Sequence, residues 1–212
     1  MEPGNFYHIY NRGNNKENIF FEEKNYYYFL KKFDEYLSAF SDVYAYCLMP
    51  NHFHFLIKIK ETSDKTSEVS KTSEVFTASY KTSEVLNQRG SKKLTPLEKA
   101  FKDFFISYAK SINRQYSRTG SLFQAKFKKK KIENDGYFTS IIQYIHANPV
   151  SAKLCSTYHA YRYSSYNAII GNAKTKIKKG EVLEWFGGRD LFIKIHQERK
   201  LEADEIKKFI SK

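Results

Sequence analysis

Cysteine is scarce in this sequence. Its 212 residues include only two cysteines, Cys47 and Cys155, and these lie far apart in the chain. Two distant cysteines offer neither a disulfide framework nor the paired spacing of a zinc knuckle. No apolar run approaches the roughly 20 residues that span a membrane, and the opening residues, MEPGNFYHIYNRG, do not read as a signal peptide. We therefore expect a cytoplasmic protein without a membrane partner.

Acidic residues are few relative to basic ones. The chain has 36 lysines and arginines against 23 aspartates and glutamates, which gives a formal net charge of +13. Such an excess attracts polyanions, and nucleic acid is the commonest polyanion in a cytosol. Charge alone does not establish this function, because many basic proteins bind nothing specific. Hydrophobic residues make up 41% of the chain and aromatic residues 17%, which is enough for a packed core.

The first part of the chain reads as strand, helix, strand and strand. Phe6–Tyr10 has strand composition, and the turn residues NRGNN follow it. In residues 22–40 the apolar side chains recur at helical spacing, so we expect an amphipathic helix. Residues 42–49 and 52–60 read as two strands, and the Pro-Asn pair between them is a turn signal. We expect these two strands to pair as a hairpin.

The composition changes abruptly in residues 61–95. This stretch is poor in aromatic residues and rich in Ser, Thr, Lys and Glu, and it contains the pentapeptide KTSEV three times, starting at Lys65, Lys71 and Lys81. The intervals between the copies are too short and too unequal for a solenoid repeat. We expect a flexible, low-complexity insertion in a loop.

Regular structure is expected again from Thr95 onward. Thr95 and Glu98 fit a capping box, and apolar residues then recur at helical spacing. Residues 121–134 read as a strand with a basic end. Residues 135–148 read as a further helix. We expect it to end near Asn148, because the following proline disfavours helical geometry in the residue before it.

The predicted order is strand, helix, strand, strand, helix, strand, helix, followed by a tail with two short helical pieces, EVLEWFGG and EADEIKKFISK. This order predicts an α+β sandwich, ferredoxin-like, with an antiparallel sheet and its helices on one face. We expect one domain over residues 1–170, which carries the insertion, and a helical C-terminal extension over residues 171–212.

Two histidines, His52 and His54, lie one residue apart in the expected strand 52–60. Residues two apart on a strand point to the same face, about 6.6 Å apart, so both imidazoles project together while Phe53 and Phe55 enter the other face. Such a pair can converge on one divalent ion: Zn, Cu, Fe or Ni, or Mn or Mg when oxygen ligands complete the shell. The alternative is a pair of half-buried histidines with hydrogen-bonded rings, which is the commoner case for an isolated His-x-His.

The predicted helix 135–148 carries groups that could complete such a site. Tyr144 and Asn148 are four residues apart and share one helix face. Asn148 Oδ1 could be a hard metal ligand, and the Tyr144 hydroxyl could attack a phosphodiester. A phenol has a pKa near 10, so it is a weak nucleophile at neutral pH, and a metal on the phosphate lowers that barrier. Gln143 and His146 are competing polar groups, and spacing alone does not select Tyr144 from 17 tyrosines.

Several motifs occur together in one order. MPNHFHFLIK is preceded by YHIYNRG and followed by GSLFQAKFK, YIHANPV and YRYSSY, over about residues 6–166. In this combination the chain resembles the single-tyrosine HUH transposases, in which H is histidine and U a bulky apolar residue, and most closely their REP-associated branch. The insertion and the tail beyond about Asn172 have no counterpart in that pattern.

The resemblance implies an HUH endonuclease fold with a ferredoxin-like sheet. It implies His52 and His54 as metal ligands, Asn148 as a third ligand, Tyr144 as the nucleophile, and Mg²⁺ or Mn²⁺ as the cofactor. The implied reaction cleaves single-stranded DNA and leaves a 5′-phosphotyrosine and a free 3′-OH. Attack by another 3′-OH then rejoins the DNA without ATP. Relatives of this kind recognise hairpins formed by palindromic repeats.

Basic residues offer candidate DNA contacts. The densest run is KFKKKK, near the end of the predicted strand 121–134. Arg12, Arg114 and Arg118 are further candidates, with aromatic residues nearby that could stack on unpaired bases. The alternative for the basic run is a solvated strand end. Within the run, the expected phosphate contacts are Lys126, Lys128, Lys129 and Lys130.

Three functions compete at this point. The first is a metal-dependent DNA strand transferase, the second a domesticated hairpin-binding protein for DNA or RNA that no longer cuts, and the third a basic RNA-binding domain with coincidental histidines. The two histidines together with Tyr144 and Asn148 favour the first over the second. The first also requires His52, His54 and the Tyr144 hydroxyl to converge on one pocket. Both a monomer and a homodimer remain open.

Overall fold

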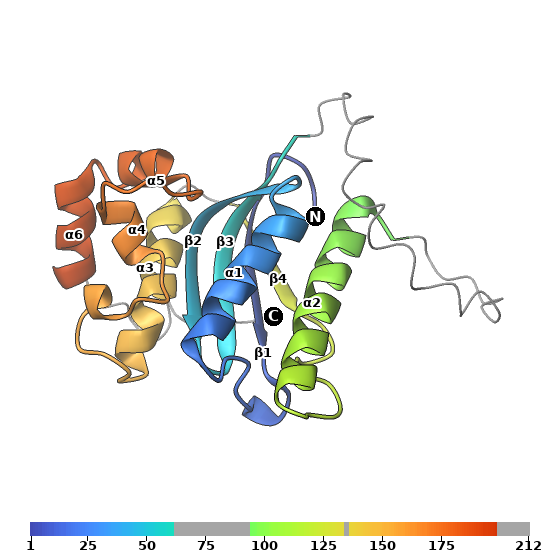
Figure 1. Ribbon diagram of the computed structural model, residues 1–212. Helices are drawn as coiled ribbons and strands as arrows, with labels where there is room; N and C mark the ends of the chain where they lie inside the picture. The colour runs from blue at the N-terminus through green and yellow to red at the C-terminus, as the bar shows by residue number, and fades with distance from the viewer. Residues whose placement is uncertain (62–93, 134–135, 199–212) are drawn as a thin grey trace.

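The computed structural model describes residues 1–61, 94–133 and 136–198 (Figure 1). Most of the predicted insertion and the second predicted tail helix, 202–212, lie outside the described residues. Two short 3₁₀ helices cover Asn14–Lys16 and Tyr158–Ala160. The strands are β1 (Phe6–Arg12), β2 (Ser41–Met49), β3 (His52–Ile59) and β4 (Lys128–Ile132), and the helices are α1 (Glu23–Leu37), α2 (Pro96–Gln115), α3 (Gly136–Ser151), α4 (Tyr166–Ile170), α5 (Lys179–Trp185) and α6 (Arg189–Glu198).

The strands form one antiparallel sheet in the order β2-β3-β1-β4. The elements from β1 to β4 follow the sequence strand, helix, strand, strand, helix, strand, which is the ferredoxin-like arrangement. β1 and β3 lie at the centre of the sheet and pair from Phe6 opposite Lys58 to Arg12 opposite His52. The predicted α+β class and the antiparallel sheet are confirmed.

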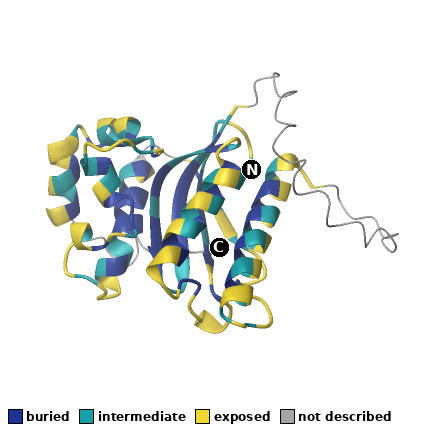
Figure 2. Ribbon diagram, in the orientation of Figure 1, coloured by how far each residue is buried: buried dark blue, intermediate teal, exposed yellow. Residues whose placement is uncertain are grey.

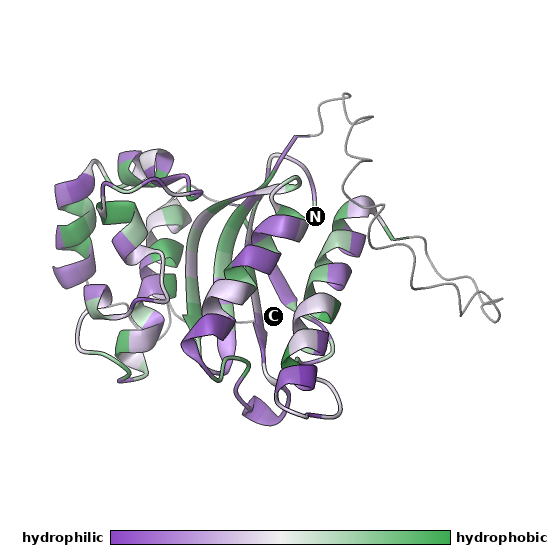
Figure 3. Cartoon of the chain, viewed as in Figure 1, coloured by the Kyte–Doolittle hydropathy of each residue, from purple (hydrophilic) through white to green (hydrophobic). Residues whose placement is uncertain are grey.

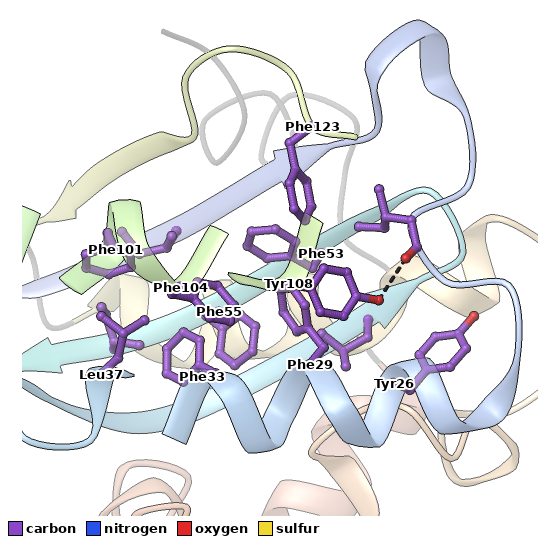
Figure 4. Packing of buried hydrophobic residues seen from close by; sticks show 14 of the residues in the cluster. Tyr26, Phe29, Phe33, Leu37, Phe53, Phe55, Phe101, Phe104, Tyr108 and Phe123 are labelled. Carbon is purple, nitrogen blue, oxygen red and sulfur yellow. Dashed lines mark hydrogen bonds between the residues drawn. The ribbon is translucent and has the colours of Figure 1, made fainter. Parts of the chain in front are cut away.

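One face of the sheet forms the main core, because side chains alternate along each strand. Phe53 and Phe55 of β3 are buried against α1 and α2, and Figure 4 shows this packing. The rings of Phe33 and Phe55 lie parallel with centroids 4.3 Å apart. The Tyr108 hydroxyl, buried in this cluster, donates to the Ile19 carbonyl at 2.8 Å. Each large apolar side chain buried here contributes about 1.5–3 kcal/mol, and hydrophilic residues occupy the outward surfaces of α1 and α2 (Figure 3).

The start of α2 has the capping box that the sequence predicts. Thr95 Oγ1 accepts from the Glu98 backbone N–H at 3.2 Å, and Glu98 Oε2 accepts from the Thr95 backbone N–H at 2.9 Å. Pro96 occupies the first turn, where its missing N–H costs nothing. These contacts fix where the second core helix begins.

The opposite face of the sheet is also covered, which corrects the prediction that the helices lie on one face. Helix α3 packs against β2 and β3, and α4 to α6 lie beside it (Figures 1 and 2). The physical reason is that this face is apolar near β2. Phe6 and Tyr44 lie there and contact Trp185 of α5, with ring centroids 5.5 and 5.1 Å away. The domain boundary expected at residue 170 stays a prediction.

Helix α3 continues to Ser151, so the predicted end near Asn148 is wrong, and Pro149 lies inside the helix. A proline has no N–H for the carbonyl four residues earlier, which here belongs to Ile145. The Asn148 side chain compensates in part. Its Nδ2 donates to the Tyr144 carbonyl at 2.8 Å and contacts the Ile145 carbonyl at 3.5 Å. This local bonding offsets the preference of a residue before proline for extended geometry.

Other boundaries also differ from the expected ones. Only the last part of the predicted strand 121–134 is a strand. Leu122 and Phe123 instead fill the main core, and Phe123 makes an isolated bridge to Gly13. Helices α4 and α6 were not predicted, because both are short and their apolar residues do not form a long helical pattern. Within the described ranges, no helix is long and apolar enough to cross a membrane. Both cysteines are free, as expected.

Candidate active site

A pocket of about 300 Å³ lies between helix α3 and the sheet face that carries the two histidines. It contains the predicted nucleophile, the three predicted metal ligands and two of the predicted DNA contacts. The other three lining residues, Tyr10, Asn11 and Gln124, are not among the predicted site residues. The pocket is lined by Tyr10, Asn11, Arg12, His52, His54, Gln124, Lys128, Tyr144 and Asn148.

Strand β3 positions the histidines. The register with β1 sets Arg12 opposite His52 and Tyr10 opposite His54, and strand alternation turns these four side chains to one face. The two imidazole rings have centroids 5.2 Å apart and perpendicular planes. His54 is only 4% exposed, whereas His52 is half-buried. The pair therefore forms the wall of the pocket on the sheet side.

The Nδ1 atom of each histidine has a close polar neighbour. His52 Nδ1 lies 2.6 Å from Asn51 Oδ1, and His54 Nδ1 lies 2.9 Å from Nε2 of His8. The other nitrogen of each ring, Nε2, is not engaged by these two neighbours. His8, which is fully buried on β1, is not among the predicted site residues. Alternation along YHIYNRG was a usable signal, because it places His8, Tyr10 and Arg12 on one face.

Both imidazoles are neutral at neutral pH. The pKa of His52 is lowered to about 4, first by burial and then by the charge of Arg12, and a hydrogen bond with Asn148 opposes the shift. Burial, followed by the proximity of His8, holds the pKa of His54 well below its ordinary value. Neutral imidazole is the form that binds metal ions, so protons do not compete for these nitrogens near pH 7.

Helix α3 presents Tyr144 and Asn148 to the pocket from one helix face. The Tyr144 ring meets the His54 ring nearly perpendicularly, with centroids 5.5 Å apart. Burial raises the pKa of Tyr144 to about 12, and a hydrogen bond with the Asn148 side chain opposes this shift. The phenol is therefore protonated at neutral pH and is a weak nucleophile without help.

The polar atoms of the pocket could hold a divalent cation. Because the Asn148 Nδ2 bonds the helix carbonyls, its Oδ1 is the atom that can accept from the pocket side. Two neutral imidazoles and one amide oxygen could hold Zn, Cu, Fe or Ni, or Mn²⁺ or Mg²⁺ when further oxygens complete the shell. In the part of the chain that the structure describes, no group of three or more His, Cys, Asp and Glu side chains could hold a metal. A third protein ligand here would be the Asn148 amide.

The basic run is divided between the two faces of the sheet. The register of β4 with β1 places Lys128 and Lys130 on the face of the pocket and Lys129 on the opposite face. Lys126 and Lys129 line a different pocket, beside α2. Of the predicted lysines, the structure therefore brings only Lys128 into the candidate site.

The predicted arginines are also separated. Arg12 lines the pocket, whereas Arg114 is exposed near the end of α2. Arg118 forms an ion pair with Glu17 at 2.7 Å and lies over the Phe21 ring. Arg118 thus has a structural role that the sequence analysis did not foresee, and only Arg12 of the three lies beside the histidines.

The competing polar residues of α3 face away from the pocket. Gln143 Nε2 donates to the Ile195 carbonyl at 3.0 Å, and His146 Nδ1 lies 3.0 Å from His196 Nε2. Both contacts tie α3 to α6 inside the second core. This leaves Tyr144 and Asn148 as the residues of α3 that line the pocket.

The sequence matches no protein-family model and no curated protein. The fold is similar to a solved structure, that of a REP-associated tyrosine transposase bound to a REP hairpin. The TM-score is 0.56 and the sequence identity 12%, over 81% of this chain and 82% of that chain. At this identity, the similarity establishes that the two chains share a fold.

Proposed function

We propose that this protein is a metal-dependent DNA strand transferase that cuts and rejoins single-stranded DNA through a covalent bond to Tyr144. The observation that carries the proposal is the convergence of His52, His54, Tyr144 and Asn148 on one pocket. A structural histidine pair, or an RNA-binding sheet, does not require this meeting. Helix α3 comes from a distant part of the chain and could have presented any of its faces to the histidines.

In the proposed reaction, the Tyr144 oxygen attacks the phosphorus of a phosphodiester. One oxygen–phosphorus bond forms, the bond to the 3′-oxygen breaks, and the proton lost by the phenol is balanced by the proton that the 3′-oxygen gains. The products are a 5′-phosphotyrosine and a free 3′-OH. A second 3′-OH attacks the phosphotyrosine in the reverse sense and releases Tyr144, so each broken phosphoester is replaced by another and ATP is not needed.

His52, His54 and Asn148 are the residues that would hold Mg²⁺ or Mn²⁺. Such an ion, when bound, draws charge from the phosphoryl oxygens and orients the bond to be cut. The chain contributes neutral imidazoles and a fixed amide. The Asn148 side chain also opposes part of the rise in the Tyr144 pKa that burial causes.

The proposed substrate is DNA with a hairpin and single-stranded flanks. The structural neighbour is bound to a REP hairpin, and the formal net charge of +13 favours any nucleic acid. Arg12 and Lys128 would hold the phosphate that is cut, because both line the pocket. Lys130, which shares the pocket face of β4 with Lys128, would contact the DNA farther along.

A nicking assay separates this proposal from a hairpin-binding protein that no longer cuts. Oligonucleotides carrying palindromic hairpins from the DNA around the gene are incubated with the protein and Mn²⁺, and binding and cleavage are followed separately. We expect cleavage with Mn²⁺ that stops when EDTA removes the ion, while binding persists. Tight binding without cleavage under every metal condition would support the silent binder instead.

A further inference from the structure

Each of the two pocket histidines has a hydrogen-bond partner at its Nδ1 atom. Asn51 and His8 contact the Nδ1 atoms of His52 and His54, at 2.6 and 2.9 Å respectively. A neutral imidazole has one N–H and one lone pair. The partner of Nδ1 therefore decides whether Nε2 offers a lone pair or a hydrogen to the pocket.

The orientation of the Asn51 amide is fixed by the turn after β1. The side-chain Nδ2 of Asn51 donates to the Lys16 carbonyl at 3.2 Å. The backbone carbonyl of Asn51 accepts from the Gly13 backbone N–H at 2.8 Å. Gly13 is required in this turn, because a Cβ there would clash with the Glu17 carbonyl. With Nδ2 used in this way, Asn51 Oδ1 faces His52. An amide oxygen only accepts, so the contact with Asn51 favours the proton on His52 Nδ1, while the contact with Asn148, whose Oδ1 also accepts, competes for it from the pocket side.

The contact between His8 and His54 has the geometry of a true hydrogen bond. The ring planes differ by only 16°, and the centroids are 5.1 Å apart while the two nitrogens are 2.9 Å apart. The bond therefore runs close to the common plane of the rings, where the N–H and the lone pair point. Of the two possible directions, only donation from His54 Nδ1 to His8 Nε2 leaves a lone pair on His54 Nε2.

We propose that Asn51 and His8 are positioning residues that hold His52 and His54 with their Nε2 lone pairs toward the pocket. The proposal rests on the proposed function, since it assigns those lone pairs to the metal. Partners of this kind fix the tautomer and ring orientation of metal-binding histidines, and their loss typically reduces metal affinity about 10–100-fold. In this proposal Asn51, which forms the turn with Pro50, also orients the ring of His52.

The direct test is the tautomer of each histidine in the metal-free protein. Long-range ¹H–¹⁵N spectra of protein labelled at histidine distinguish the Nδ1–H form from the Nε2–H form. We expect the Nδ1–H form for both His52 and His54 in the wild type, and an Nε2–H form at either residue would overturn the assignment for that residue. This measurement needs no variant, so it does not depend on whether a variant folds.

The second test is Mn²⁺ affinity measured without DNA. His8→Leu and Asn51→Ala are expected to weaken Mn²⁺ binding about 10–100-fold, whereas His8→Gln, which keeps an acceptor near His54 Nδ1, should restore most of the affinity. The matched control is His196→Leu, which removes one member of the other buried histidine pair. Unchanged Mn²⁺ affinity in a folded His8→Leu protein would overturn the role of His8. If the wild type shows the Nδ1–H tautomers but binds no Mn²⁺, the proposed function is overturned. The positioning of the two histidines by Asn51 and His8 is then still supported.

Discussion

The rings of His54 and Tyr144 meet at nearly right angles with centroids 5.5 Å apart, although the chain passes through α2 and β4 between β3 and α3. This contact exists because α3 crosses the face of the sheet opposite the main core. The apolar residues near β2 hold α3 there, and the same placement brings Tyr144 and Asn148 over the histidines. The candidate site is therefore a consequence of how the second face of the sheet is covered.

We predict that His52→Ala and His54→Ala each abolish Mn²⁺-dependent cleavage while the protein stays folded. The rings line the pocket, and only His54 is deeply buried. His54→Ala should therefore cost more stability, about 1–3 kcal/mol, because it removes the buried hydrogen bond between His54 Nδ1 and His8 Nε2. Cleavage and circular dichroism are measured on the same samples. The control is His159→Ala on the exposed surface. Unfolding of both variants would favour a structural histidine pair.

We predict that Asn148→Asp retains Mn²⁺ binding and that Asn148→Ala loses much of it, because only the aspartate keeps an oxygen beside the histidines. Both variants lose the Nδ2 donor to the Tyr144 carbonyl and should be destabilised by a similar amount, about 1 kcal/mol. Titration of Mn²⁺ and chemical denaturation of each variant separate the two effects. Equal affinities of the two variants would exclude Asn148 as a ligand.

We predict that Lys128→Ala reduces the salt dependence of single-stranded DNA binding by about 0.7 in the slope of log K against log salt, which is the contribution of one phosphate contact. Lys131→Ala is the matched control. Lys131 belongs to the same strand but faces the other side of the sheet, where it pairs with Glu2 at 2.7 Å. Binding is measured at several salt concentrations. A larger change in slope for Lys131→Ala would place the DNA on the other face.

We predict that stability falls as the pH drops from about 6.5 towards 4. The pKa values of His52 and His196 are lowered to about 4, and those of His54 and His146 lie well below the ordinary value, in each case mainly because of burial. Each folded pKa is thus below the unfolded value of about 6.5. The unfolded chain binds more protons in this window, and the free energy of unfolding decreases as the pH falls.

Urea denaturation between pH 8 and pH 5 measures this effect above the range in which ordinary carboxylates titrate. His196→Phe should flatten the pH dependence, because it removes one of the histidines that resist protonation. A free energy of unfolding that stays constant from pH 7 to pH 5 would contradict the assignment of these histidines as buried and neutral.

The sequence predicted the features that depend on local periodicity. Alternation in HFHF separates the histidines from Phe53 and Phe55, and the four-residue spacing of Tyr144 and Asn148 places both on one face of α3. Features that depend on individual side-chain hydrogen bonds, within a helix or between strands, were not predictable. The helix passes Pro149 because the Asn148 side chain bonds its carbonyls. His8 appeared to be one polar residue in an aromatic strand, and only the pairing of β1 with β3 shows that it supports His54.

The most direct test of the proposed function is the identity of the residue that becomes attached to DNA. Single-stranded hairpin DNA is incubated with the protein and Mn²⁺, the mixture is digested with protease, and the peptide that carries the nucleotide is sequenced by mass spectrometry. The account predicts a 5′-phosphate bonded to Tyr144, and no adduct in Tyr144→Phe, which should still bind the hairpin because it loses a single hydroxyl. A covalent adduct on another tyrosine, or one that persists in Tyr144→Phe, would contradict the account.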